Sequence, residues 1–431
     1  MKHSTSKKLA AAALAAALAI PLSACTKGGS SAQSAAGSGE LLMWTHNAGN
    51  EAELEAITTV VNDFNDSQDK YQVKIQAFPQ DSYNQSVVAA AASKKMPCIL
   101  DMDGPNVPNW AWAGYLAPLE GMDDILGKFL PSTVGKYNDK TYSYGYYDVA
   151  LTMVSRKSVL EKNGIRVPTV EQPWTKDEFN AALEKIQQSG EFQYPADFST
   201  GDTGEWWPYA YSPMLQSFGG DLINRSDFRS ADGALNSPEA IEWAKWFRDL
   251  AERKLIPLKS SADPAKDFIN EKTAILWAGS WVAVDTREAF GDDVVFLPPP
   301  DLGKGAKIGG GSWQWGMSAS CAEAEGAMEY LKFAAQDKYV ALVSTATKTI
   351  PTTDAAAAEV PGYEPGGEND VFRQLSKNFA LVRPETPGYP FIATEFTKVA
   401  QDILNGADPE TALNQAVANI DANQEANGFF E

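Results

Sequence analysis

Strand-like and helix-like segments alternate along this chain from residue 40 onward, and this order limits the possible folds more than any other feature. The segment ELLMWT (40–45) predicts a strand, AELEAITTVVNDFNDS (52–67) carries apolar residues at helical spacing, and YQVKIQAF (71–78) alternates like a second strand. A strand, a helix and a strand at this spacing predict the start of a βαβ unit. The chain is therefore expected to adopt an α/β fold.

The alternation continues to the C-terminus without an internal repeat. We expect further helices at 82–94, 175–189, 237–253, 322–336 and 392–405, and further strands at 97–101, 147–155, 273–278, 294–297 and 312–319. With 431 residues, of which 44% are apolar, the chain is too long for one ordinary core. Two domains, or one fold with two lobes, are therefore expected.

The N-terminal segment predicts export and lipid attachment. Three lysines precede LAAAALAAALAIPL (9–22), a run too short to cross about 30 Å of hydrocarbon as a stable helix, so residues 1–24 are predicted to be a signal peptide. LSAC (22–25) resembles the bacterial lipobox, which implies cleavage before Cys25 and attachment of a diacylglycerol, with chains such as palmitate, to its thiol. A chance cysteine in an ordinary signal peptide is the alternative. Residues 25–39, rich in Gly, Ser and Ala, are expected to form a flexible linker.

Net charge limits the classes of partner, and the cysteine content limits the possible disulfides. Without residues 1–24 the chain carries 33 Lys and Arg against 56 Asp and Glu, a net charge of −23 that repels phosphate backbones. Because no basic stripe appears either, nucleic acid is excluded as a partner. The two remaining cysteines, Cys98 and Cys321, lie far apart in the sequence. Export permits a disulfide between them, but we expect buried free thiols.

Catalytic and metal-binding motifs are missing from the sequence. His46 is the one histidine left after removal of the signal peptide, and no GxSxG, HExxH or P-loop pattern occurs. A calcium loop beginning at Asp101 would need Gly and Glu where the chain has Asn106 and Trp112. We therefore expect neither an enzyme nor a metal or other cofactor. A surface glycoside hydrolase acting through carboxylates and a tethered carbohydrate-binding adhesin remain alternatives.

Eight segments carry a resemblance to a known family. They are MWTHNAGN (43–50), PCILDMDGPNVPNWAWAGYLAPL (97–119), YGYYDVALTMVSRKSVLEKNGI (144–165), PWTKDEF (173–179), KTAILWAGSWV (272–282), GGGSWQWGMSAS (309–320), RPETPGYP (383–390) and DILNGADPETAL (402–413). In their order and spacing, from about residue 40 to the C-terminus, the chain resembles the solute-binding proteins of bacterial ABC sugar importers, the class that includes maltose-binding protein.

The resemblance implies a two-lobed periplasmic-binding-protein fold of type II, in which three hinge crossovers let the lobes close on a ligand. Projected onto this chain, lobe one comprises 40–147 with 281–320, and lobe two comprises 148–280 with 321–431. The implied function is sugar transport: a monomeric lipoprotein on the extracellular face of the cell membrane, in a Gram-positive organism, captures an oligosaccharide of two to four units. It then delivers this ligand to the permease subunits of an ABC importer. The identity of the sugar is not predicted.

Tryptophans are the first candidates for ligand contact. A sugar offers flat C–H patches and a rim of hydroxyls, so its receptor needs aromatic planes and planar hydrogen-bonding groups. Among twelve tryptophans we favour Trp206, Trp281 and Trp313 as such planes, with packing in the core as the alternative for each. Strand alternation would place Trp313 and Trp315 on one face. The tryptophans expected to be structural are Trp110, Trp112, Trp174, Trp243 and Trp246.

Polar candidates complete the predicted site. His46 and Asn47 directly follow the first strand, where ligand contacts begin in folds of this class. The others are carboxylate, amide, phenol and guanidinium groups that the family's layout places near the ligand or at a crossover. The full predicted polar set is His46, Asn47, Asp103, Asn106, Tyr147, Asp148, Glu205, Arg383 and Tyr389.

Overall fold

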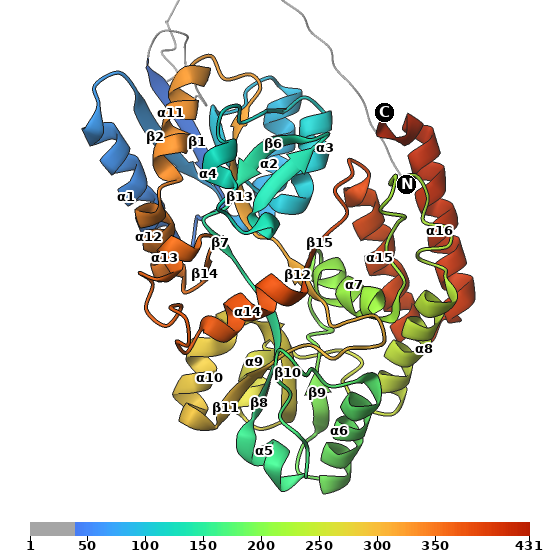
Figure 1. The fold of residues 1–431 in the computed structure, drawn as a ribbon. Coiled ribbons are helices and arrows are strands. Elements are labelled where there is room, and N and C mark those ends of the chain that lie inside the picture. The colour runs from blue at the N-terminus through green and yellow to red at the C-terminus, as the bar shows by residue number, and fades with distance from the viewer. Residues whose placement is uncertain (1–38) are drawn as a thin grey trace, which may run out of the picture. The chain divides into compact units, whose positions relative to one another are not determined.

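The computed structural model describes residues 39–431 (Figure 1). The predicted signal peptide, the predicted lipidation at Cys25 and all but the last residue of the predicted linker lie outside this range. Within it, no helix has both the length and the apolar character needed to cross a membrane.

The first of two main sheets has seven strands. β1 runs parallel to both of its neighbours, so that Met43 is paired with Ile75 on one side and with Ile99 on the other. The order is β2-β1-β3-β13-β6-β5, with β4 paired to the antiparallel β13. The strands are β1 (Glu40–Thr45), β2 (Gln72–Ala77), β3 (Ile99–Asp103), β4 (Leu116–Ala117), β5 (Val134–Tyr137), β6 (Lys140–Tyr144) and β13 (Trp313–Ser318).

Helices that pack on the first sheet follow the predicted apolar spacing. In α1 (Glu51–Ser67) the buried residues Ile57, Val60, Val61 and Phe64 recur at helical intervals, and removing a side chain such as Phe64 would cost about 3–5 kcal/mol. The Asn50 side chain caps this helix at the backbone N–H of Glu53. The other helices of this part are α2 (Gln80–Ala92), α3 (Val107–Trp112), α4 (Asp123–Leu126), α11 (Ala324–Ala334) and α12 (Asp337–Thr347).

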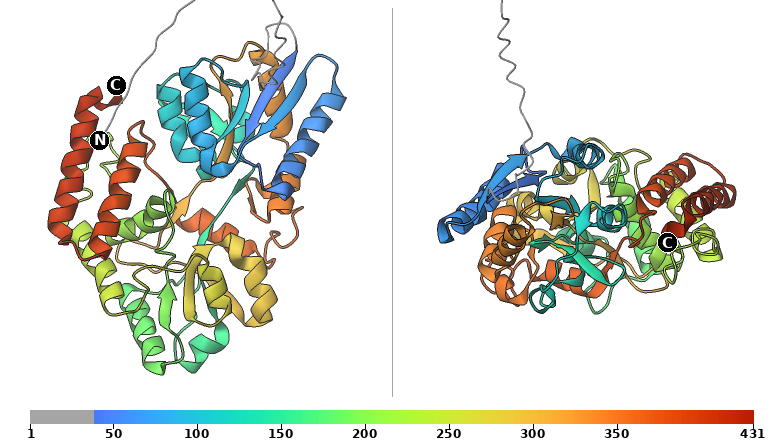
Figure 2. Two further views of the ribbon diagram at one scale, coloured as in Figure 1. Left: turned by 180° about the vertical axis from the view of Figure 1, so that it is seen from behind. Right: turned by 90° about the horizontal axis from the view of Figure 1, so that it is seen from above.

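The second sheet has four strands in the order β11-β8-β10-β9. Every residue of β10 is buried, which explains its nearly continuous apolar sequence TAILWAG. The strands are β8 (Leu151–Arg156), β9 (Tyr194–Asp197), β10 (Thr273–Gly279) and β11 (Val294–Leu297). The helices of this part are α5 (Lys157–Lys162), α6 (Lys176–Ser189), α7 (Trp206–Phe218), α8 (Pro238–Glu252), α9 (Pro264–Ile269), α10 (Ala283–Phe290), α15 (Tyr389–Leu404) and α16 (Pro409–Ala426). The last two lie side by side (Figure 2).

Two short ladders lie where the chain passes between the sheets (Figure 1). β7 (Tyr147–Asp148) pairs with β14 (Ile350–Pro351), and β12 (Ile308–Gly310) pairs with β15 (Ala380–Val382). The helices α13 (Asp354–Ala357) and α14 (Asp370–Phe379) flank these ladders in sequence.

The strand pairings divide the chain differently from the expected lobes in two places. β11 pairs with β8, so residues 294–297 lie in the second sheet, whereas the expected division has 281–320 in lobe one. Conversely, α11 and α12 return to the first sheet, where Tyr330 of α11 meets Phe64 of α1 edge to face at 5.3 Å. The expected division has these helices in lobe two.

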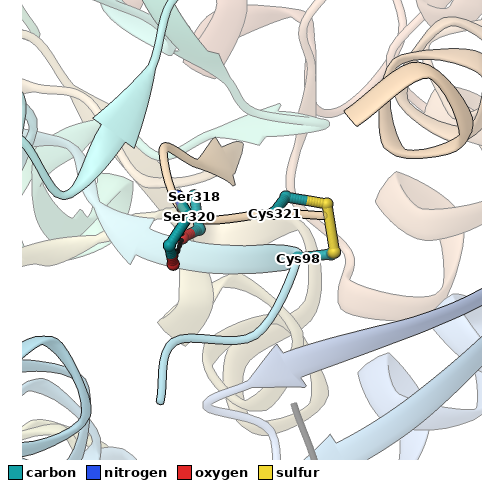
Figure 3. Close-up of a disulfide and its surroundings, with 4 residues drawn as sticks. All are labelled: Cys98, Ser318, Ser320 and Cys321. Carbon is teal, nitrogen blue, oxygen red and sulfur yellow. Dashed lines mark hydrogen bonds between the residues drawn. A yellow bond between two sulfur atoms is a disulfide. The ribbon is translucent and has the colours of Figure 1, made fainter. Parts of the chain in front are cut away.

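The expectation of free thiols is wrong, because Cys98 and Cys321 form a disulfide (Figure 3). Cys98 directly precedes β3 and Cys321 lies just beyond the end of the neighbouring β13. Antiparallel pairing of these two strands, with Met317 opposite Ile99, brings the cysteines together although 223 residues separate them. The disulfide therefore closes a very long loop within the first sheet, for which a contribution of about 2–4 kcal/mol to stability is typical.

Tryptophans expected to be structural are mostly buried. Trp110, Trp174 and Trp243 are almost fully enclosed in the core. Trp246 is half-buried and donates from Nε1 to Asn180 Oδ1 at 2.9 Å. Trp112 differs from the expectation, since 43% of it is exposed and its ring meets Phe430 edge to face.

Candidate functional site

Strand ends of the first sheet carry the first half of the site. β1 ends at Thr45 and is followed by His46 and Asn47, while β3 ends at Asp103. Trp313 begins the antiparallel β13 and is paired with Asp103, so it stands at the same edge of the sheet. Predicted residues from three separate segments thus meet at this edge.

His46 is a buried residue held by a carboxylate and an indole. Its Nδ1 lies 2.6 Å from Oδ2 of Asp101, and its ring stacks on Trp313 at 3.6 Å between centroids with 11° between planes. Although burial lowers the pKa of His46, the negative charge of Asp101 and the hydrogen bond to it raise that pKa above its ordinary value. One face of Trp313 is therefore covered by a ring of fixed orientation.

Asn47 and Tyr147 are enclosed beside this pair. The Asn47 amide lies 3.2 Å from His46 Nε2 and its carbonyl accepts a hydrogen bond from the hydroxyl of Thr45. The Tyr147 hydroxyl donates to Oε1 of Glu53 at 2.9 Å. Burial raises the pKa of the Glu53 carboxyl, while the nearby His46 opposes the shift. Both predicted residues thus act mainly on other side chains of the site.

Arg383 joins the two halves of the site. Its Nη1 donates to Oε1 of Glu205 at 2.7 Å, and its Nη2 lies 3.6 Å from Oδ1 of Asp103. The Tyr389 hydroxyl donates to the same oxygen of Glu205. Burial raises the pKa of both Asp103 and Glu205, and the guanidinium of Arg383 opposes that shift. Four predicted residues from three distant segments therefore form one charged cluster.

Two indoles form the second half of the site, in the part of the chain that is built around the second sheet. Trp206 begins α7 and Trp281 lies in the 3-10 turn Ser280–Val282 that directly follows β10. Their rings meet edge to face, with 6.2 Å between centroids, and Trp281 is 49% exposed. Gly279 makes this arrangement possible, because a Cβ there would lie 1.9 Å from the Trp281 ring.

The neighbouring residues Trp206 and Trp207 place their rings in different environments. Trp207 is buried and donates from Nε1 to the carbonyl of Asp202 at 2.8 Å. Trp206 is half-buried and donates from Nε1 to the Tyr211 hydroxyl at 3.2 Å. Both rings belong to the first turn of helix α7.

Two predicted residues stand apart from this arrangement. Asp148 is fully buried and accepts hydrogen bonds from the hydroxyls of Ser132 and Ser376 and from the backbone N–H groups of Val149 and Gly311. It therefore fastens the crossover segments and faces no open space. Asn106 is half-buried at the end of the 3-10 turn after β3, and within residues 39–431 it makes no hydrogen bond with the other predicted residues.

Sequence reasoning missed three residues of the site. Asp101 holds His46, and Glu53 lies in the first turn of α1, three positions after its cap. The Tyr209 ring lies under the guanidinium of Arg383 at 5.2 Å, and its buried hydroxyl has no hydrogen-bond partner among the described residues. A signal existed only for Glu53, because an acidic residue in a first turn directly after the first strand faces the same edge as His46.

The assembled site combines exposed indole faces with carboxylates and a guanidinium. Within residues 39–431, no group of three or more His, Cys, Asp or Glu side chains is placed to hold a metal ion. The polar groups present can exchange hydrogen bonds with hydroxyls, and the indoles can cover apolar ring faces. This is the chemistry of a binding site for a polyhydroxylated, ring-shaped solute.

Comparison with known proteins agrees with the geometry. The family model described as bacterial extracellular solute-binding protein matches residues 59–367. The diacetylchitobiose-binding protein DasA of Streptomyces coelicolor is 23% identical over 335 residues, which cover 75% of each chain.

Solved structures share the fold, which confirms the predicted two-lobed α/β architecture of type II. The cyclic α-maltosyl-1,6-maltose-binding protein of Arthrobacter globiformis is 24% identical with a TM-score of 0.75, covering 89% of this chain and 98% of that one. The GacH receptor of Streptomyces glaucescens is 22% identical with a TM-score of 0.70, covering 90% and 97%. Because the family model spans well over half of the chain, the protein belongs to the bacterial extracellular solute-binding proteins.

Proposed function

We propose that this protein captures an oligosaccharide of two to four units between its two lobes and delivers it to the permease of an ABC importer. The observation that carries the proposal is the edge-to-face pair of Trp206 and Trp281, of which Trp281 is half exposed, beside the buried charged cluster around Arg383. An indole left in water forgoes about 25 cal/mol for each Å² that a partner could cover. A flat sugar face is a suitable partner for such a ring.

The ligand class follows from the mixture of groups. Relatives named for a diacetylated chitobiose and for a cyclic maltosyl-maltose share the family or the fold. Asp103 and Glu205 offer acceptors to sugar hydroxyls, and Arg383 offers donors. A trisaccharide with about 34 heavy atoms, at about −0.3 kcal/mol for each atom, reaches about −10 kcal/mol and thus sub-micromolar affinity at best. Such affinity suits a transport receptor, which must also release its ligand.

Closure supplies the coupling to transport. In the closed form, charged groups from the first sheet and indoles from the second would contact one ligand together. A ligand that binds the closed form more tightly shifts the population toward closure. The closed form then docks on the permease, and the lipid at Cys25 keeps the protein at the extracellular face of the membrane.

Calorimetric titration of the purified protein tests the proposal. We would titrate maltose, maltotriose and maltotetraose, and the N-acetylchito-oligosaccharides of the same lengths, and analyse the recovered sugar for new reducing ends. We expect saturable binding of at least one series, with the sugar recovered intact. Binding of no oligosaccharide would reject the proposal, and cleaved sugar would favour a glycoside hydrolase.

Matched variants locate the site. Trp206→Ala and Trp281→Ala are each expected to weaken binding at least about tenfold, because each removes an aromatic plane worth more than 1.4 kcal/mol to the complex. Leu258→Ala removes another apolar side chain that is about half exposed, outside the site, and is expected to leave affinity unchanged. Unchanged affinity in both tryptophan variants would contradict the assignment of these rings.

A further inference from the structure

Trp281 also lines a groove whose other lining residues are not among the predicted site residues. The groove has a volume of about 430 Å³, within the range of about 300–1,000 Å³ that is usual for small-molecule sites. Trp281 and Val284 line it from the turn after β10 and from α10, and Lys348 and Tyr363 line it from the segment that follows α12. The groove is therefore built from segments that are far apart in the sequence.

The walls of this groove are held in place by polar contacts. Arg287 donates from Nη1 to Oδ1 of Asn369 at 2.6 Å and from Nη2 to the carbonyl of Glu368 at 2.7 Å. In the segment that follows α12, the Tyr363 hydroxyl donates to the carbonyl of Lys348 at 3.1 Å. These bonds join α10 to the segment before α14, so the groove exists without a ligand.

Ser280 and Asp285, two residues of the groove lining, carry polar groups without a hydrogen-bond partner among residues 39–431. Ser280 is 3% exposed and lines the groove, yet its hydroxyl makes no hydrogen bond within residues 39–431. An unpaired buried hydroxyl is unfavourable, so a ligand hydroxyl that reaches it would be favoured there. The exposed carboxylate of Asp285 lines the same groove and likewise accepts no hydrogen bond in that part of the chain.

Trp281 connects the groove to the main site. Its ring meets Trp206 edge to face at 6.2 Å and also lines the groove. We propose that the groove binds the next sugar units of the same oligosaccharide, so that the ligand has at least three units and passes across Trp281. This inference rests on the proposed function and deepens it, because it assigns a minimum chain length and a subsite for neutral sugar units.

The chain offers a matched pair of variants on one helix. Val284→Trp places an indole in the groove from the second residue of α10, whereas Ala289→Trp places one on an exposed position of the same helix that does not line the groove. Thermal melting checks that both variants fold. The probes are maltose, maltotriose and maltotetraose, with the N-acetylchito-oligosaccharides of the same lengths, each titrated by calorimetry.

In the unmodified protein, we expect affinity to rise at least about tenfold from the disaccharide to the tetrasaccharide of the series that binds. Val284→Trp should remove that rise, leaving less than about a twofold difference, and Ala289→Trp should keep it. Equal affinity for all lengths in the unmodified protein, or a rise that survives Val284→Trp, would overturn the subsite while leaving the proposed function intact. Absence of binding by either series would instead reject the proposed function itself.

Discussion

The two halves of the site differ in how far their chemistry is already satisfied within the protein. At the edge of the first sheet, His46 is 5% exposed, paired with Asp101 and stacked on Trp313. On the second sheet's side, Trp281 is 49% exposed and makes one edge contact with Trp206. We infer that the first half is a fixed platform, whose residues contribute to folding, whereas the second half forgoes stability that a ligand can restore.

Removing the charge of Asp101 should give the largest effect and should act on folding. Asp101→Asn leaves the buried His46 without its counter-charge, and breaking a buried pair in this way costs about 3–5 kcal/mol. Urea unfolding measures the free energy. Asp402→Asn, which removes an exposed pair with Lys398, is the control and should change that free energy by less than about 1 kcal/mol. A loss in Asp101→Asn no larger than in the control would show that the first half is not a platform.

Replacing the stacked Trp313 should mainly affect stability, whereas replacing the exposed Trp281 should mainly affect ligand binding. Trp313→Ala removes the ring on which His46 stacks and should lower the free energy of unfolding by about 3 kcal/mol. Trp281→Ala should change stability by less than about 1 kcal/mol and weaken oligosaccharide binding at least about tenfold. Urea unfolding and calorimetry on both variants test the contrast. The comparison fails if Trp281→Ala destabilises the protein as much as Trp313→Ala does.

Arg383 lies on the boundary between the halves, so a conservative change there should have an intermediate effect. Arg383→Lys keeps the charge but cannot direct two nitrogens at Glu205 and Asp103 in the same fixed fork. We expect a loss of about 1–3 kcal/mol in the free energy of unfolding. Full stability in this variant would mean that a single point charge is enough at this position.

The fold was largely predictable because its signals are local. The helices expected at 175–189 and 237–253 are α6 and α8, each begun by the cap that the sequence shows, Thr175 and Ser237. The sequence does not predict which elements, far apart along the chain, pack against each other. Nothing in the apolar spacing of α11 tells that it packs on α1, since any buried partner would satisfy the same pattern.

The site was predictable in residue type more than in role. The aromatic and charged candidates do gather, with Arg383, Glu205, Asp103 and Tyr389 in one cluster. Asp148 could not be told from a ligand contact, because two of its four donors, Gly311 and Ser376, are remote from it in sequence. The disulfide between Cys98 and Cys321 could not be predicted for a similar reason, since it depends on which strands are neighbours in the sheet.

The smallest expected effect is a pH dependence that belongs to the first half alone. The pKa of His46 is raised in the folded protein despite its burial, because Asp101, and more weakly Glu53 and Asp103, favour the protonated ring. A raised pKa of this kind contributes stability that is fully present below the unfolded value of about 6.5 and is lost as pH rises through the folded value. The difference in unfolding free energy between the unmodified protein and His46→Asn should therefore shrink as pH rises above about 6.5.

Trp281→Ala should leave the pH profile unchanged, since no titrating group is altered. A difference that stays constant from about pH 5.5 to about pH 9 would mean that the pKa of His46 is the same in the folded and unfolded protein, and a difference that grows with pH would mean that the buried imidazole is neutral. The platform would then be held by its stacking on Trp313 without help from charge.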